Sequence, residues 1–274
     1  MKSDLSVSIV VYKTNENVLF RCMNSILNSK LKIHLDVIDN SPSDRLRDIC
    51  KQVNANYVFN RRNRGYGAGH NIAMQRTILE DVKYHLILNP DIYFQDDVLN
   101  CLCDFMDNHP DIGLVMPKIL YPDGSIQYLC KLLPAPIDLI RRRFLARKCF
   151  SKKDRLYELR FADYNRTMDV PYLSGCFMFI RTEVVSRVGL FDERFFMYLE
   201  DVDLSRRMHV HSRTVYYPEV SVYHEYEKGS YKNRKLLRYH IVSAFKYFNK
   251  WGCFYDPERK KVNQKCLKEL CGEK

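Results

Sequence analysis

The residues best suited to chemistry in this chain occur in four short clusters. The first is Asn89-Pro90-Asp91, directly after the apolar run of residues 85–88. A carboxylate that ends a strand in a proline-stiffened turn can hold Mn²⁺ or Mg²⁺, whose remaining positions are filled by diphosphate oxygens and water. Such an aspartate is also a common turn or cap residue, so the tripeptide alone leaves both readings open.

The second cluster is the basic, glycine-rich sequence RRNRGYGAGHN at residues 61–71. Three glycines permit close approach of the backbone, and three arginines favour an anion at the N-terminus of the helix expected next. The spacing is GxGxG, and His70 stands where a dinucleotide fingerprint has its third glycine, so nicotinamide binding is not predicted. A phosphate-bearing ligand fits best, with a plain glycine-rich turn as the alternative.

The third cluster places acidic residues in an aromatic setting within residues 191–207. A helix expected from about residue 199 puts Glu200 and Asp201 in its first turn, where the helix dipole favours carboxylates. The aromatic residues just before them indicate a carboxylate delivered to an apolar pocket, which suits a general base. The alternative is ordinary helix-end charge with a surface ion pair between Asp203 and Arg207, four residues apart.

The fourth cluster centres on His224, which ends the apolar strand pattern of residues 220–223. Its imidazole can bind a metal ion. A lone histidine after a strand is more often structural. His209 and His211 share no metal-like spacing with it, and we expect those two at the surface. The sequence therefore leaves both roles of His224 open.

Strand and helix patterns alternate through the first half of the chain. The predicted strands cover residues 5–12, 33–39, 57–60 and 84–88. The predicted helices cover residues 15–28, 44–53 and 68–79. This order predicts a mostly parallel sheet flanked by helices, and ligands bind beyond the carboxyl ends of the strands in such sheets. Polar residues crowd at those ends, beginning with Tyr12, Asp39 and Asn40.

The second half of the chain departs from this rhythm. Helices are predicted at residues 96–109, 199–211 and 232–251, strands at residues 113–116, 171–181, 214–217 and 220–224, and a hairpin turn at residues 121–124. Residues 130–168 have an irregular, very basic sequence and are predicted to lie outside the core. An acceptor lid, a membrane contact and a dimer contact are all compatible with that segment.

Composition and charge limit the class of protein. The 274 residues, 46% of them hydrophobic, suffice for one α/β domain with a modest appendage. No stretch of about 18 uncharged apolar residues predicts a membrane-spanning helix, and the N-terminus lacks the features of a signal peptide, so a cytosolic location is expected. Ten scattered cysteines without a CxxC pair then predict free, buried thiols. The net charge of +11 indicates an anionic partner.

In combination, the clusters resemble the family 2 glycosyltransferases, in particular the rhamnosyltransferase-like branch of bacterial surface polysaccharide synthesis. The matching pieces occur in the family's order at residues 8–12, 37–41, 63–71, 89–91, 173–178 and 191–203, and at His224. The resemblance implies a GT-A type α/β fold with a Rossmann-like, mostly parallel sheet. Its parts would be a nucleotide-sugar half (about residues 1–95), an acceptor half (about residues 96–230) and a basic amphipathic helical tail (residues 231–274).

The resemblance also implies an inverting, metal-assisted enzyme. The donor-binding residues would be Tyr12, Asp39, Asn40, Asn63, Arg64, Gly65, Asn71 and Asn89, with Asp39 at the nucleobase. Asp91 stands where the family's DxD motif has its metal-binding aspartate, and His224 would complete the Mn²⁺ or Mg²⁺ site. Asp201 resembles the catalytic base, and Glu200 is the second choice. Asn89 replaces the first aspartate of DxD, which leaves the strength of metal binding open.

The implied partners are a dTDP- or UDP-sugar, with rhamnose as the favoured sugar, and a lipid-linked or polysaccharide glycan acceptor. Basic residues flank the apolar positions of residues 232–251, which suits an anionic membrane surface, and packing on the domain is the alternative. A nucleotidyltransferase acting on a sugar phosphate would need a second metal carboxylate near Asp91, and Asn89 argues against it. Nucleic acid is not expected, because the basic residues are split among three segments without a recognised binding motif.

Overall fold

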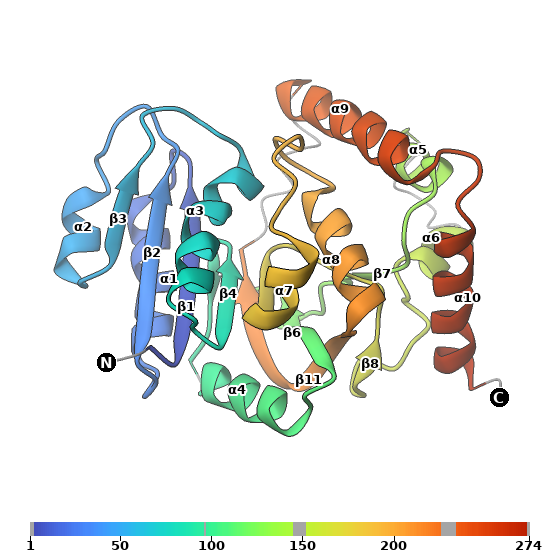
Figure 1. The fold of residues 1–274 in the computed structure, drawn as a ribbon, viewed down its shortest axis with the longest axis horizontal. Helices are drawn as coiled ribbons and strands as arrows, with labels where there is room; N and C mark the ends of the chain where they lie inside the picture. The colour runs from blue at the N-terminus through green and yellow to red at the C-terminus, as the bar shows by residue number, and fades with distance from the viewer. Residues whose placement is uncertain (1–2, 96, 145–151, 226–233, 273–274) are drawn as a thin grey trace.

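A computed structural model describes residues 3–95, 97–144, 152–225 and 234–272, and Figure 1 shows it as a ribbon. Its main sheet has the strand order β3-β2-β1-β4-β10-β6-β11-β5, with β8 paired to β11. These strands are β1 (Leu5–Val11), β2 (Ile33–Asp39), β3 (Asn56–Phe59), β4 (Tyr84–Leu88), β5 (Ile92–Tyr93), β6 (Ile112–Leu120), β8 (Met168–Asp169), β10 (Phe177–Arg181) and β11 (Arg213–His224). A second sheet pairs β7 (Cys130–Lys131) with β9 (Tyr172–Leu173).

Helices cover the sheet and extend the second half of the chain. They are α1 (Glu16–Leu27), α2 (Arg47–Gln52), α3 (Tyr66–Leu79), α4 (Val98–Asn108), α5 (Pro136–Phe144), α6 (Lys152–Tyr157), α7 (Thr182–Val188), α8 (Glu200–His211), α9 (Arg234–Trp251) and α10 (Pro257–Cys271). The predicted α/β class is confirmed. Among the described residues, no helix is both long enough and apolar enough to cross a membrane.

The first four strands pair in parallel with one another, as predicted. β1 pairs in parallel with β2 and β4, and β2 pairs in parallel with β3. Every residue of β4 and nearly every residue of β1 is buried, which is typical of parallel strands covered on both faces. Because the strands are parallel, their carboxyl ends lie at one edge, next to residues 12, 39–41, 60–65 and 89–91.

The prediction of one strand over residues 171–181 is wrong. Tyr172–Leu173 pairs with β7, whereas Phe177–Arg181 enters the main sheet antiparallel to both β4 and β6. A turn at residues 174–176 separates the two strands. Phe177 is the register partner of Leu88, so this turn lies beside the carboxyl end of β4.

The two strands predicted over residues 214–224 are one strand, β11. It pairs in parallel with β6, with a register shift between Tyr217 and Ser221. Pro218 lies inside the shifted stretch and has no backbone N–H to donate, so it interrupts the ladder without ending the strand. Sequence alone could not distinguish an irregularity in one strand from a gap between two.

The expectation that residues 130–168 lie outside the core is also wrong for the described part of this segment. It contains β7, α5, α6 and β8, and it buries Leu132, Leu133, Tyr157, Leu159 and Tyr164. The dense basic residues concealed this apolar pattern. Residues 145–151 lie outside the described part of the chain.

The C-terminal segment is packed against the domain rather than appended to it. Tyr247 and Phe248 of α9 join Phe195, Leu199 and Val202 in a second hydrophobic cluster, and Cys266 of α10 reaches the main core. In Figure 1, α9 crosses the top of the second half of the molecule beside α5, and α10 descends along its edge. The helix predicted at residues 232–251 is confirmed from Arg234 onward, and α10 lies in the tail predicted to be helical, although the sequence analysis gave no bounds for a second helix there.

Candidate active site

The donor side of the predicted site is the loop of residues 61–65 and the first turn of α3. The Asn40 side-chain amide donates to the carbonyl of Gly65 at 3.0 Å, and Asn63 Oδ1 accepts from the Gly65 N–H at 2.9 Å. Gly65 has φ +95°, and a Cβ there would lie 2.3 Å from the carbonyl oxygen of Phe196. The backbone therefore requires glycine at this position.

Positive charge surrounds this loop. The side chains of Arg61, Arg62 and Arg64 are all exposed at the carboxyl edge of the sheet. The helix dipole of α3 points its positive end at the same place, because the helix begins at Tyr66. Exposed guanidinium groups and a helix N-terminus together suit a diphosphate.

Asp39 and Tyr12, both predicted near the nucleobase, lie further along this edge. Asp39 is fully buried, and its carboxylate accepts from the Ser41 N–H at 2.7 Å and from the Tyr57 hydroxyl at 2.6 Å. Burial, followed by the bond to Asp39, raises the pKa of Tyr57, so this hydroxyl keeps its proton and donates. Tyr12 is 47% exposed. Tyr57 was missed because its link to Asp39 depends on the pairing of β2 with β3.

Two neighbouring residues of α3 make internal contacts. His70 is buried, with Nδ1 2.7 Å from Ser8 Oγ, and burial lowers the pKa of the imidazole well below its ordinary value. Asn71 accepts from the Phe191 N–H at 3.0 Å and donates to the Phe191 carbonyl at 2.9 Å and to Glu193 at 3.0 Å. Asn71 thus ties α3 to the segment before α8, and its contact with a donor stays a prediction.

Asp91 and His224 face each other at the carboxyl edge of β4. Asp91 Oδ1 lies 3.3 Å from His224 Nε2. The Gln127 side-chain amide donates to the His224 carbonyl at 2.8 Å, so we assign its Oε1 as the acceptor for His224 Nδ1 at 2.9 Å. This contact orients Nε2 toward Asp91, as the partner of a metal-binding histidine does. Gln127 was missed, because nothing in its local sequence marks it.

The electrostatics of this pair set a proton against a metal ion as the partner of Asp91. Burial lowers the pKa of His224, but the neighbouring Cys176 thiol and the Asp91 carboxylate outweigh burial and raise it to about 10. The imidazole therefore has to lose its Nε2 proton when a metal ion binds. The described residues hold no group of three or more His, Cys, Asp or Glu side chains able to bind a metal. Two protein ligands suit Mg²⁺ or Mn²⁺ shared with a diphosphate.

The turn at residues 174–176 joins the donor loop, the Asp91 turn and α8. The Tyr66 hydroxyl donates to the Gly175 carbonyl at 2.6 Å, and the Gly175 N–H donates to Asp201 at 2.9 Å. The next carbonyl, of Cys176, accepts from the Asn89 N–H at 2.9 Å. Burial, followed by the charges of Cys176, Glu200, Asp201 and Asp91, raises the pKa of Tyr66 well above its ordinary value. Glu200, Asp201 and Asp91, which were predicted as site residues, therefore lie close enough to the Tyr66 phenol to affect its pKa.

Asp201 and Glu200 occupy different environments at the start of α8. Asp201 Oδ2 accepts from the Tyr172 hydroxyl at 3.1 Å and from the Gly175 N–H, and its Oδ1 accepts from the Val202 N–H at 2.9 Å. Glu200 is 5% exposed, and burial, followed by the charge of Asp201, raises its pKa well above the ordinary value. Three donors thus fix the orientation of the Asp201 side chain, while Glu200 favours the protonated form.

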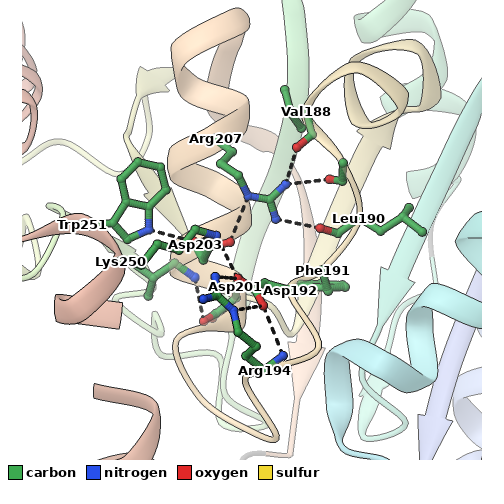
Figure 2. A network of polar contacts seen from close by, with 12 residues as sticks. Val188, Leu190, Phe191, Asp192, Arg194, Asp201, Asp203, Arg207, Lys250 and Trp251 are labelled. Atoms are coloured by element: carbon green, nitrogen blue, oxygen red, sulfur yellow. Dashed lines mark hydrogen bonds and ion pairs between the residues drawn. The ribbon is translucent and has the colours of Figure 1, made fainter. Parts of the chain in front are cut away.

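The alternative interpretation of this segment was a surface ion pair between Asp203 and Arg207, and the structure forms that pair with Asp203 in the interior. Asp203 is fully buried and bonds Arg207 at 2.9 Å, as the four-residue spacing predicted. It also accepts from Lys250 and from the indole N–H of Trp251, both at 2.7 Å, as Figure 2 shows. Arg207 in turn donates to the carbonyls of residues 188–190. The end of α9 is therefore bonded to the first two turns of α8.

Further contacts join α9 to the segment before α8. Lys250 also contacts Asp192 at 3.0 Å, and Ser243 Oγ donates to the Met197 carbonyl at 2.8 Å. Tyr198 and Leu199 both have positive φ, at 71° and 67°. Such backbone persists only when surrounding contacts hold it, and these contacts come from α9.

The remaining predictions concern histidines and cysteines. His211 is exposed as expected, but His209 is half-buried, with Nδ1 2.7 Å from Thr214 Oγ1. The described cysteines are all free. Six of them are buried and three, at positions 101, 253 and 271, are exposed, so the expectation of buried thiols holds only in part.

The fold is that of GT-A glycosyltransferases. The chain superposes on GalNAc-T7 crystallised with UDP, GalNAc and Mn²⁺ with a TM-score of 0.60 at 16% identity, covering 82% of this chain and 43% of that one. It superposes on residues 1–349 of S. aureus TarS with a TM-score of 0.58 at 15% identity, covering 98% of this chain and 72% of that one. At these identities the likeness concerns the fold.

Residues 6–189 match the model of glycosyl transferase family 2, and the chain belongs to this family. Rhamnosyltransferase WbbL of Escherichia coli K12 is 25% identical over 249 residues, 87% of this chain and 90% of that protein. The N-acetylglucosaminyl-diphospho-decaprenol L-rhamnosyltransferase of Mycobacterium tuberculosis is 31% identical over 144 residues. That match covers 51% of this chain and 46% of the mycobacterial protein, so the similarity spans about half of the relative's length.

Proposed function

We propose that the chain is an inverting glycosyltransferase that moves a sugar from a nucleoside diphosphate to an acceptor hydroxyl. The turn at residues 174–176 is the observation that carries this proposal. It bonds Tyr66 of the donor loop, Asn89 of the Asp91 turn and Asp201 at the start of α8. A donor diphosphate, a cation and a base are needed within one site, and this turn joins the three segments that would supply them.

Asp201 acts as the general base in this proposal. Its carboxylate takes the proton of the acceptor hydroxyl, whose oxygen attacks the anomeric carbon from the side opposite the leaving diphosphate. Tyr172 and the Gly175 N–H hold the other lone pairs of Asp201 and so fix its direction. A positioned base contributes about 10²–10⁴-fold in rate.

Asp91 and His224 would hold Mn²⁺ or Mg²⁺. A bound cation stabilises the charge of the departing diphosphate. Gln127 keeps His224 turned toward Asp91, and the exposed arginines of residues 61–64 would neutralise the remaining phosphate charge. Asn89 supplies no carboxylate, so these arginines carry more of the charge compensation than they would beside a DxD motif.

For the donor and acceptor we propose a dTDP- or UDP-sugar, with rhamnose preferred, and a glycan linked to a lipid diphosphate. The support comes from the two relatives named rhamnosyltransferases, one of them named for a decaprenol-diphosphate acceptor. A Haloferax volcanii relative, named a low-salt glycan biosynthesis hexosyltransferase, is 25% identical over 210 residues. Any experiment that identifies the donor must therefore also include nucleotide-linked hexoses.

A thermal-shift panel of dTDP-, UDP- and GDP-sugars, each with and without Mn²⁺, tests the donor assignment. A ligand at about 100 times its dissociation constant adds roughly 2.7 kcal/mol of stability, which is readily measured. We expect a shift with one pyrimidine nucleotide class that grows when Mn²⁺ is present. A folded sample that shows no shift with any of these donors would contradict the proposal.

A further inference from the structure

The outer faces of α5 and α9 expose large apolar side chains. On α9 these are Ile241, Val242 and Phe245, of which Phe245 is 75% exposed, and on α5 they are Ile137 and Ile140, each about half exposed. Exposed apolar residues that gather on neighbouring helices indicate a binding surface. These five residues define the α5/α9 face.

The two helices are neighbours. Leu139 of α5 and Ala244 of α9 pack against the same second hydrophobic cluster, which contains Tyr247 and Phe248. Figure 1 shows both helices at the top of the second half of the molecule. Because their inner faces pack on the same cluster, their outer faces lie on the same side of the protein.

Basic residues accompany the apolar ones on α9. Arg234, Lys235 and Arg238 are exposed, and Arg234, Arg238, Ile241 and Phe245 recur at three- and four-residue steps, so they share one helix face. The sequence of α9 contains no aspartate or glutamate. A helix with exposed cations and apolar side chains on one face suits the interface of an anionic bilayer, whereas a protein partner would not require the absence of acids.

The α5/α9 face lies beside the proposed active site. The carboxyl ends of β1 and β4 point to the top in Figure 1, the side that α9 crosses. The opposite, buried side of α9 holds the segment that leads to Glu200 and Asp201, through Ser243 and Lys250. A bilayer on the outer side would therefore lie near the entrance to the site.

We propose that the α5/α9 face binds the surface of an anionic lipid bilayer, with α9 lying in the plane of the interface. Phe245, Ile241 and the α5 isoleucines enter the boundary between head groups and acyl chains, and Arg234 and Arg238 contact lipid phosphates. The binding itself does not depend on the proposed function. A second statement does rest on the proposed function: the enzyme meets a lipid-linked acceptor at the membrane surface.

Flotation with acceptor-free vesicles of phosphatidylcholine, with and without phosphatidylglycerol, tests this surface. We expect the full chain to bind only the anionic vesicles and to detach as salt rises. Arg234→Glu with Arg238→Glu should lower the partition coefficient about 25-fold or more, because each basic residue near the surface contributes about fivefold. The control is Lys260→Glu with Lys261→Glu on α10. This pair changes the net charge by the same amount and should lower the partition coefficient less than about threefold.

A second pair of variants tests the apolar contacts. Phe245→Glu should lower binding about tenfold or more, since a buried phenylalanine contributes at least that much. Leu79→Glu, at an 85% exposed position at the end of α3, should leave binding unchanged. Unchanged thermal midpoints confirm that the variants are folded.

Three results would overturn the proposal: no vesicle binding by the unaltered chain, equal losses in the α9 and α10 charge variants, or a dimer that Phe245→Glu dissociates without affecting vesicle binding. Release of nucleoside diphosphate from the donor, measured on the same protein samples without lipid but with a water-soluble glycan acceptor whose hydroxyl takes the sugar, separates this proposal from the proposed function. Turnover without vesicle binding overturns only the membrane surface, and vesicle binding without turnover overturns only the proposed function.

Discussion

The donor half and the acceptor half of the site are held together in different ways. In the donor half, Asn40, Asn63 and Gly65 form contacts within one sheet edge, and the arginines of the loop remain exposed. In the acceptor half, the buried carboxylate of Asp203 near the start of α8 is held by Lys250 and Trp251 of α9, about 50 residues further along the chain. The donor half is therefore encoded by short segments at strand ends, and the acceptor half by long-range polar contacts.

This difference has an energetic consequence. Exposed ion pairs contribute little to stability, because water and salt screen them. A buried charge that loses one partner is costly, because its desolvation is no longer compensated. The start of α8 should accordingly respond to the loss of its buried carboxylate far more strongly than the donor half responds to the loss of an exposed ion pair such as Asp44–Arg47.

The largest expected effect is on stability, from Asp203→Ala. This change leaves Arg207, Lys250 and Trp251 without their shared acceptor and should lower the free energy of unfolding by about 3–5 kcal/mol. Asp44→Ala, which removes an exposed partner of Arg47 in the donor half, is the matched control and should leave the urea midpoint unchanged. Equal losses of unfolding free energy in the two variants would contradict the proposed difference between the donor half and the acceptor half.

The next effect is on turnover, from Gly175→Ala. A Cβ at this position would lie 2.9 Å from the Asp201 Cβ and 3.3 Å from its Oδ2, so the carboxylate has to move. A misplacement of about 1 Å can cost 10²-fold, and we expect kcat to fall by about that factor while donor KM changes little. Gly124→Ala adds the same methyl group in a hairpin turn where nothing lies within 4 Å; its φ of +82° makes alanine costly for stability, but kcat should be kept. An unchanged kcat in Gly175→Ala would show that the turn does not position Asp201.

A smaller effect is expected on metal affinity, from Gln127→Ala. Loss of the partner that orients His224 should weaken Mn²⁺ binding about 10–100-fold in the presence of the nucleoside diphosphate. Gln52→Ala, at an exposed position of α2, is the control. Titration calorimetry measures both, and equal affinities would show that His224 does not bind the metal.

The smallest effect is a pH dependence caused by Glu200. Its folded-state pKa is raised, so the folded protein binds more protons than the unfolded chain above the ordinary pKa of glutamate, and stability falls as pH rises from about 4.5. Glu200→Gln should flatten this fall, which thermal midpoints between pH 5 and pH 8 would measure. A variant that keeps the wild-type slope would contradict the assignment of a protonated Glu200.

The difference between local contacts in the donor half and long-range contacts in the acceptor half also explains which features could be predicted from the sequence. The strands of the donor half were predicted closely, because β-branched runs and helix-spaced apolar residues are local signals. Asp201, Asp91 and His224 were predicted from short motifs, and the structure brings their segments together. Tyr57, Gln127 and Trp251 were not predicted, because their roles depend on strand pairing and on contacts between distant helices. Asp203 was misplaced at the surface, since a four-residue spacing specifies a partner and not its burial.

The most direct test of the account is a comparison of Asp201→Asn with Glu200→Gln under saturating donor and acceptor. The account predicts that Asp201→Asn lowers kcat about 10²–10⁴-fold with donor binding intact, because only the proton acceptor is lost. Glu200→Gln should keep most of the turnover. A loss of donor binding in Asp201→Asn, or a greater loss of turnover in Glu200→Gln, would contradict the assignment of Asp201 as the base.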